Sequence, residues 1–193
     1  GHAYAGAPCM KIVTISLCFD GTNNHEPSDS EAKPSTTTNV ARLYHASLGR
    51  NENEVVRREG FYAYYMQGVG TEFKEIREFE PNSDGLTKAV GGENRINWGI
   101  TRVIDALKMA CGAKQLTLDE SYALVQKMGT SLTEDLLGVS LFKNSYTRRQ
   151  EVLAAPLAEL KSQIDAAHAS KTIPEIKAVR LFVYGFSRGA AQA

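Results

Sequence analysis

A serine between two glycines, near the end of the sequence, has the spacing of an enzyme nucleophile. Gly185, Ser187 and Gly189 form a G-x-S-x-G pattern that follows the strand-forming residues 179–184 and precedes small, helix-forming residues. At such a strand-turn-helix junction the serine hydroxyl projects above the sheet edge, and the flanking glycines let strand and helix pass closely. We therefore predict that Ser187 is a catalytic nucleophile, with an ordinary Gly/Ser turn as the alternative.

A second group of residues could form an oxyanion hole. Such a site needs a backbone N–H from the residue after the nucleophile and another from the loop that follows an earlier strand. Arg188 supplies the first donor. Gly21 or Thr22 is the candidate for the second, because both follow the apolar residues 12–19 at the end of a predicted strand. We expect Asp20 to orient this loop, and the alternative is a plain β-turn stabilised by the Asp20 side chain.

The elements that must position these residues read as an alternating α/β fold. Residues 12–19 and 61–66 are strand-forming and largely apolar, and residues 39–48 between them have a helical period. Two strands joined by a helix imply parallel pairing. The polar turns at 20–24 and 67–71 then lie together at the carboxyl edge of the sheet, where ligands bind in such folds.

Helices are predicted between and after these strands. Thr38 is a candidate N-cap for the helix at 39–48, and Gly49 closes it. A second helix ends at Gly112, and a capping box that starts at Thr117 opens a third. The positions on the predicted inward faces are Val40, Leu43, Tyr44, Ser47 and Leu48, then Ile96, Ile100, Val103, Ile104, Leu107 and Cys111, then Tyr122, Val125 and Met128, and finally Leu153, Leu157, Leu160, Ile164 and Ala167.

The amino-acid composition indicates the class of protein and the cellular compartment. The chain has 193 residues, 42% of them hydrophobic and 23% charged, which suits one globular domain. Lys plus Arg and Asp plus Glu number 22 each, so no overall field attracts nucleic acid or an anionic membrane. Cysteines at positions 9, 18 and 111 suit a reducing compartment. No secretory signal pattern and no apolar window of about 18 residues is present, so we expect a soluble protein made in the cytoplasm.

Several motifs together resemble one family. The motifs are Phe19-Asp-Gly-Thr-x-Asn24, Thr38-Asn-Val40, Tyr64-Tyr-x-x-Gly-Val-Gly-Thr71, Gly91-Gly92 and Gly185-Phe-Ser-Arg-Gly-Ala190. In this order they resemble the α/β-hydrolase domain of the type VI secretion phospholipase effectors of the Tle1 class, first catalogued as DUF2235. The resemblance covers residues 12–112 and 178–193, and the combination is far more specific than any single motif.

The resemblance implies a fold, an activity and partners. The fold is a mostly parallel sheet with helices on both faces. The activity is a lipase that cleaves ester bonds of membrane phospholipids in rival bacteria and requires no metal. The protein would be delivered by a contractile secretion machine, with its spike protein as a partner, into the periplasm of the target cell. An immunity protein would restrain it in the producing cell.

Two segments lie outside the predicted alternation of strands and helices. Residues 113–172 separate the helix that ends at Gly112 from the nucleophile strand, and they read as a helical insert in which Pro156 starts or kinks the last helix. Within the insert, residues 136–142 are apolar enough for a lid or a membrane-touching loop, with buried packing as the alternative. Residues 26–34, in the loop after the first strand, are expected to be mobile.

The partners that a catalytic serine needs are not evident in the sequence. A serine requires an adjacent base held by a carboxylate, and α/β-hydrolases place both after the nucleophile in chain order. The four histidines all precede Ser187 and read as loop or surface residues. They are His2, His25, His45 and His168. We therefore expect residues 1–193 to be the amino-terminal part of a longer catalytic domain. The competing interpretation is a complete fold whose base is His25 or His45.

Two alternatives come from other functional classes. The strand that leads into Asp20 resembles the first motif of haloacid-dehalogenase-like phosphatases, in which an aspartate is the nucleophile. That motif needs a second aspartate two residues before Asp20, and Cys18 occupies the position. The other alternative is a catalytically inert binding module that retains the hydrolase fold. A fluorophosphonate label reacts only with an activated serine, and so distinguishes a serine hydrolase from both of these alternatives.

No cofactor is expected. Residues 68–70 are rich in glycine but lack the G-x-G-x-x-G spacing, and no helix follows them directly as in a nucleotide site. His25, Glu26 and Asp29 carry groups that bind metals, but they lie in a loop without fixed geometry or supporting residues. The sequence therefore predicts neither a nucleotide nor a metal.

Overall fold

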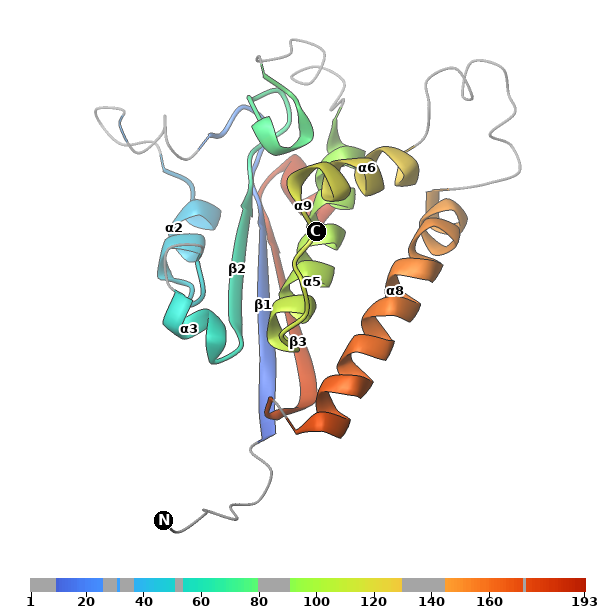
Figure 1. Cartoon of the computed structure of the whole chain (residues 1–193). Helices are drawn as coiled ribbons and strands as arrows, with labels where there is room; N and C mark the ends of the chain where they lie inside the picture. The colour runs from blue at the N-terminus through green and yellow to red at the C-terminus, as the bar shows by residue number, and fades with distance from the viewer. Residues whose placement is uncertain are drawn as a thin grey trace.

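A three-stranded parallel sheet lies at the centre of the molecule (Figure 1). The computed structural model describes residues 10–25, 31, 37–50, 54–79, 91–129, 145–171 and 173–193. β1 (Met10–Phe19) is the middle strand, between β2 (Phe61–Met66) and β3 (Glu175–Gly185). All three strands end at one edge, because Phe19 pairs with both Met66 and Gly185. The predicted parallel α/β fold is therefore confirmed.

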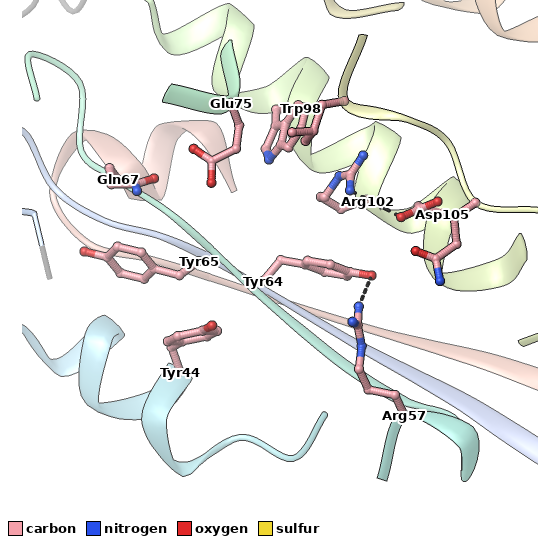
Figure 2. Close-up of a pocket in the computed structure, with 11 residues that line it drawn as sticks. Tyr44, Arg57, Tyr64, Tyr65, Gln67, Glu75, Trp98, Arg102 and Asp105 are labelled. Carbon is pink, nitrogen blue, oxygen red and sulfur yellow. Dashed lines mark hydrogen bonds and ion pairs between the residues drawn. The ribbon is translucent and has the colours of Figure 1, made fainter. Parts of the chain in front are cut away.

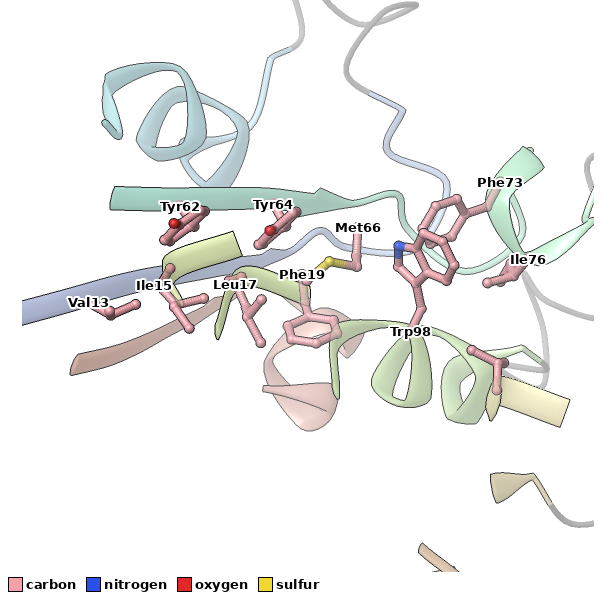
Figure 3. Packing of buried hydrophobic residues seen from close by; sticks show 13 residues of the cluster. Val13, Ile15, Leu17, Phe19, Tyr62, Tyr64, Met66, Phe73, Ile76 and Trp98 are labelled. Carbon is pink, nitrogen blue, oxygen red and sulfur yellow. The ribbon is translucent and has the colours of Figure 1, made fainter. Parts of the chain in front are cut away.

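Helices cover both faces of the sheet at β1 and β2 (Figure 1). They are α2 (Asn39–Ala46), α3 (Glu54–Arg58), α5 (Gly92–Ala110), α6 (Leu118–Met128), α8 (Ser145–Ser170) and α9 (Arg188–Gln192), with a short 3₁₀ turn, η1 (Lys74–Ile76). α2 packs on one face of β1 and β2, and α5 packs on the other (Figure 3). α6 and α8 pack against α5 and against each other, forming an outer layer beyond it.

The main core lies between the sheet and α5, and alternation along the strands places it there. Every second residue of β1 from Val13 to Phe19 is buried on this face, as are Tyr62, Tyr64 and Met66 of β2 (Figure 3). Trp98 of α5 packs against them. Complete burial of an apolar side chain of this size stabilises the fold by about 1.5–3 kcal/mol. This face therefore fixes β1 and β2 in the register that brings their ends together.

The predicted caps begin the helices as expected. The Thr38 hydroxyl accepts a hydrogen bond from the Ala41 N–H at 3.1 Å and starts α2. Thr117 and Glu120 form the reciprocal capping box of α6. Side-chain acceptors of this kind satisfy N–H groups that have no partner inside the helix. Local capping chemistry thus sets where these helices begin.

The structure corrects several expectations about the helices. α2 ends at Ala46, and the supposedly inward Leu43 and Leu48 are 44% and 59% exposed. Of the two predicted places for Pro156, the start of the helix is excluded, because Pro156 lies inside α8. The short helix α3 was not predicted from the sequence. The apolar segment at 136–142 lies outside the described residues, as does the loop at 26–34 apart from residue 31.

β3 differs from β1 because it is an edge strand of the described sheet. Its sequence is almost continuously apolar in the second half, yet Leu181 and Phe182 are 50% and 44% exposed. Consecutive strand residues point to opposite faces. Both faces of β3 are therefore open to solvent in the described chain. Strands with this composition are normally covered on both faces in parallel sheets.

Candidate active site

The backbone around Ser187 forms a strained turn between β3 and α9. Ser187 has φ 54° and ψ −126°, a conformation that non-glycine residues rarely adopt. The turn is closed by hydrogen bonds from the Gly189 N–H to the Phe186 carbonyl, at 2.8 Å, and from the Ala190 N–H to the Ser187 carbonyl, at 3.0 Å. This is the geometry expected of a serine nucleophile at a strand-to-helix junction.

The two glycines of the motif are required by close backbone packing. A Cβ atom on Gly185 would lie 2.5 Å from the Ala190 Cα, because α9 folds back over the strand end. A Cβ atom on Gly189 would lie 2.4 Å from the backbone oxygens of Phe19 and Asp20. α9 therefore rests directly on the end of β1. The packing places Ser187 next to the loop that follows β1.

Asp20 is buried and anchors that loop. Its Oδ1 accepts a hydrogen bond from the Gly21 N–H at 2.7 Å. Its Oδ2 accepts from the Tyr65 hydroxyl at 2.6 Å and from the Thr38 hydroxyl at 2.7 Å. One carboxylate thus joins the end of β1 to β2 and to the start of α2, in keeping with the expectation that Asp20 orients the loop.

The two candidate oxyanion donors on this loop differ in their hydrogen bonding. The Gly21 N–H already donates to Asp20, as described above. For the Thr22 N–H, no described residue supplies an acceptor, and the Thr22 hydroxyl is buried without a partner in the described chain. A donor for a developing oxyanion must be free in the resting enzyme. The geometry therefore favours Thr22 over Gly21.

The loop after β2 packs against the Asp20 loop through backbone contacts. A Cβ atom on Gly68 would lie 1.7 Å from the Gly21 carbonyl oxygen, so only glycine fits there. The Gly68 N–H donates to the Asn24 carbonyl at 2.9 Å, and the Asn23 N–H donates to the Val69 carbonyl at 3.0 Å. The two polar turns that the sequence placed at one edge are thus in direct backbone contact.

Arg95 organises this second loop, and the sequence analysis missed it. Arg95 is fully buried near the start of α5. Its guanidinium donates to the carbonyls of Gln67, Gly68, Thr71 and Gly91, over 2.7–3.2 Å, and to Glu78 Oε2 at 2.7 Å. Burial lowers the pKa of Arg95, and Glu78 acts in the opposite direction. The available signal was a charged residue three positions before Trp98, on the core face of an amphipathic helix.

Two of the described histidines have partners that can be named. The exposed His45 Nδ1 lies 3.2 Å from an Arg50 nitrogen, and His168 Nε2 accepts a hydrogen bond from the Ile176 N–H at 3.1 Å. His25 follows the Asp20 loop, and His2 lies outside the described residues. Among the described residues, no side chain hydrogen-bonds to the Ser187 hydroxyl. The described chain therefore contains the serine and candidate oxyanion donors without an engaged base.

Other reactive groups near the strand ends are poorly suited to catalysis. Cys18 is buried, and burial, aided by the Asp20 charge, raises the pKa of its thiol to about 12. No described group of three or more His, Cys, Asp or Glu side chains is arranged to hold a metal ion.

None of the described helices is long and apolar enough to cross a membrane.

Two comparisons with known proteins found a match, one with a protein family and one with a solved structure. Residues 13–193 match the family described as "Phospholipase effector Tle1-like, catalytic domain" of the type VI secretion system. A crystal structure of an uncharacterized protein from Pseudomonas aeruginosa is 38% identical and superposes with a TM-score of 0.83. That similarity covers 96% of this chain and 25% of the other, so the chain spans about a quarter of the length of its structural relative. No match was found among curated proteins.

Proposed function

The chain belongs to the Tle1-like family of type VI secretion phospholipase effectors, and we propose that it carries the nucleophile of a serine hydrolase that cleaves ester bonds of membrane phospholipids. The observation that carries the proposal is the strained backbone of Ser187 at the end of β3. Strain of this kind costs about 1–3 kcal/mol and persists where the surrounding packing enforces it. Here Gly185 and Gly189 allow that packing.

In the proposed mechanism, the Ser187 Oγ attacks the carbonyl carbon of an acyl ester. A histidine base accepts the serine proton as the C–O bond forms, and the carbonyl oxygen becomes an oxyanion. Backbone N–H groups of Arg188 and Thr22 stabilise that oxyanion. Collapse of the intermediate expels the lipid alcohol, which takes the proton from the base, and leaves an acyl-enzyme. Water then releases the fatty acid by the reverse sequence of proton transfers.

The histidine and its acid are proposed to lie in the rest of the whole protein. Chain order in α/β-hydrolases puts both after the nucleophile. The structural relative is about four times as long as the segment matched here, which leaves ample sequence for them. The competing sources are His25, which follows the Asp20 loop, and His45, which is exposed on α2 and lies beside Arg50.

An aspartyl phosphatase is the less favoured alternative. Both carboxylate oxygens of Asp20 accept hydrogen bonds, and the group is 1% exposed. An aspartyl nucleophile must present a free oxygen to its substrate. Asp20 has the surroundings of a structural anchor.

Activity-based labelling tests the proposal and distinguishes it from both alternatives. We expect a fluorophosphonate probe to label the whole protein, and Ser187→Ala to abolish labelling. Ser170→Ala, at the far end of α8, is the matched control and should label normally. Equal labelling of wild type and Ser187→Ala would refute the assignment. An unlabelled wild-type protein would instead favour a phosphatase or an inert binding module.

The biological setting follows from the family and is proposed with it. We infer that the whole protein is an antibacterial effector, exported with a spike protein of the type VI machine into the target-cell periplasm and neutralised in the producer by an immunity protein. Expression directed to the periplasm of a susceptible bacterium should be toxic and should depend on Ser187. Equal toxicity of wild type and Ser187→Ala would contradict the proposal.

A further inference from the structure

A cavity lies along the outer edge of β2, and Ser187 does not line it. Its volume is about 320 Å³, at the lower end of small-molecule sites, which span about 300–1,000 Å³. Tyr64 and Tyr65 both line it. Because consecutive strand residues point to opposite faces, the cavity wraps around the strand edge (Figure 2). Ser187 and Thr22 are not among its lining residues.

One end of the cavity carries a positive charge that the described chain does not neutralise. The Arg57 guanidinium lies over the rings of Tyr62 and Tyr64, 5.5 and 5.7 Å from their centroids, and donates to the Tyr64 hydroxyl at 3.2 Å. No carboxylate of a described residue lies within ion-pair distance of Arg57. Its Nε is buried without a partner among the described residues. A partly buried cation of this kind gains most from an anionic partner.

A second guanidinium in the cavity is already paired. Arg102 forms an ion pair with Asp105 at 3.3 Å, donates to the Ser121 hydroxyl and lies 4.2 Å from the Trp98 ring centroid. Burial lowers the pKa of Arg102, and Asp105 opposes that effect. Arg102 is therefore held by its own neighbours. The cation available to a ligand is Arg57.

The other end of the cavity has the features of an ammonium site. Glu75 of η1 is exposed, and no cation of a described residue pairs with its carboxylate. The rings of Tyr44 and Tyr65 stand 5.6 Å apart below it. In Figure 2 the Glu75 carboxylate points toward the space between these rings and Trp98, with Tyr64 between it and Arg57. Aromatic faces beside a carboxylate attract ammonium groups by cation–π and ionic interactions.

We propose that this cavity binds a zwitterion that carries an oxyanion at one end and an ammonium group at the other. The oxyanion pairs with Arg57, and the ammonium group lies between Glu75 and the tyrosine rings. The four charged side chains of the lining, Arg57, Arg102, Glu75 and Asp105, sum to zero. A neutral zwitterion preserves that balance, whereas a simple anion would face the Glu75 carboxylate. Phosphocholine and phosphoethanolamine have the required chemistry.

Two sources could supply this ligand, namely the head group of a zwitterionic phospholipid and the free soluble zwitterion. The lipid source rests on the proposed function, since a head-group site on the same protein as the catalytic serine would hold the enzyme on its substrate surface. The pocket assignment itself rests only on Arg57, Glu75 and the aromatic rings. Ligand binding is measured without turnover. A failure of the proposed zwitterion site can therefore be told apart from a failure of the proposed hydrolase activity.

Calorimetric titration of the whole protein carrying Ser187→Ala tests the assignment. We expect phosphocholine or phosphoethanolamine to bind at least about tenfold more tightly than inorganic phosphate or choline alone. Arg57→Gln and Glu75→Gln should each weaken binding of the zwitterion by about tenfold or more. Arg58→Gln is the matched control, because Arg58 is exposed and pairs with Glu54 on the surface. That variant should bind like the parent protein.

Vesicle sedimentation distinguishes the sources. Retention on phosphatidylcholine vesicles that falls with Arg57→Gln, with weaker retention on phosphatidylglycerol, supports the lipid head group. Binding of soluble phosphocholine without vesicle retention supports a free zwitterion. The proposal is overturned if no probe binds, if phosphate binds as tightly as phosphocholine, or if neither Arg57→Gln nor Glu75→Gln changes affinity. A protein that hydrolyses lipid but shows any of these results retains the proposed function and loses this site.

Discussion

At the scale of single residues, Asp20 determines the shape of the candidate site. Its carboxylate accepts hydrogen bonds from the Gly21 N–H and from the hydroxyls of Thr38 and Tyr65. Hydrogen bonds to a charged group contribute about 1.5–3 kcal/mol each. Together they hold the Asp20 loop so that the Gly21 N–H is occupied, whereas the Thr22 N–H has no acceptor among the described residues. Asp20 therefore contributes to the candidate site by holding the loop after β1 in place.

Removing the Thr22 N–H should slow catalysis. We predict that Thr22→Pro lowers kcat by about 10²-fold with a smaller effect on KM, since one oxyanion donor is lost. Thr22→Ala keeps the N–H and is the control, and thermal unfolding checks that both variants are folded. Equal turnover by the two variants would assign the second donor elsewhere, and Gly21 would return as the candidate.

Arg95 is predicted to be among the most sensitive residues for stability. Arg95→Gln leaves Glu78 and the carbonyls around it without their buried donor, which should cost about 3–5 kcal/mol. Arg95→Lys should recover little, because an ammonium group cannot span acceptors on three sides. Urea unfolding of the whole protein measures both effects, with the exposed Arg58→Gln as control. A lysine variant as stable as wild type would contradict this role.

At the scale of elements, the site is formed by three strand ends and the turns that follow them. Parallel pairing with Phe19 opposite Met66 and Gly185 brings the three turns to one edge. α9 can then approach β1 closely only because Gly189 has no side chain. The position of Ser187 is therefore set by packing between backbones. Side-chain contacts with Ser187 contribute little.

A methyl group at this contact should disable the site. Gly189→Ala puts a Cβ 2.4 Å from two backbone oxygens of the β1 end, and such overpacking costs about 1–3 kcal/mol or more. We predict that turnover falls by at least about 10²-fold, because α9 and Ser187 move together. Gly129→Ala is the control, since a Cβ there meets nothing closer than 3.6 Å. If both variants retain full activity, the tight contact is not needed to position Ser187.

The sequence predicts these elements well wherever the signal is local. The strands at 12–19 and 61–66, the Thr38 and Thr117 caps and the Ser187 turn depend on neighbouring residues, and all were found. Arg95 was missed, because most of its acceptors lie on another segment, the loop after β2. The Gly21 N–H donates to its neighbour Asp20, as in the alternative of a turn stabilised by the Asp20 side chain. Leu43 was placed inward by helical period alone, yet its side chain is 44% exposed.

At the scale of the whole molecule, the exposed edge of β3 is the dominant feature. Val179, Leu181, Phe182 and Val183 are each between 37% and 50% exposed on both faces of the strand. An edge with unpaired backbone groups and apolar side chains recruits other strands. The chain spans about a quarter of the length of its structural relative, and we propose that further strands of the whole protein cover this edge.

The isolated chain should therefore behave poorly. We predict that residues 1–193 expressed alone are catalytically inactive and elute as aggregates in size-exclusion chromatography. Phe182→Lys, which places a charge on the exposed strand, should shift the population toward monomer without restoring activity. A monodisperse and active 193-residue monomer would contradict this account and would favour a complete fold with its base within the described chain.

Fatty-acid release from phospholipid vesicles by the whole protein, compared between wild type and Ser187→Ala, tests the central claim most directly. Loss of a catalytic nucleophile leaves only binding and oxyanion stabilisation, so turnover should fall by several orders of magnitude. Circular dichroism and unfolding should be unchanged, because the Ser187 side chain has no hydrogen-bond partner among the described residues. Release of fatty acid by Ser187→Ala at a rate near that of wild type would contradict the claim that Ser187 is the nucleophile.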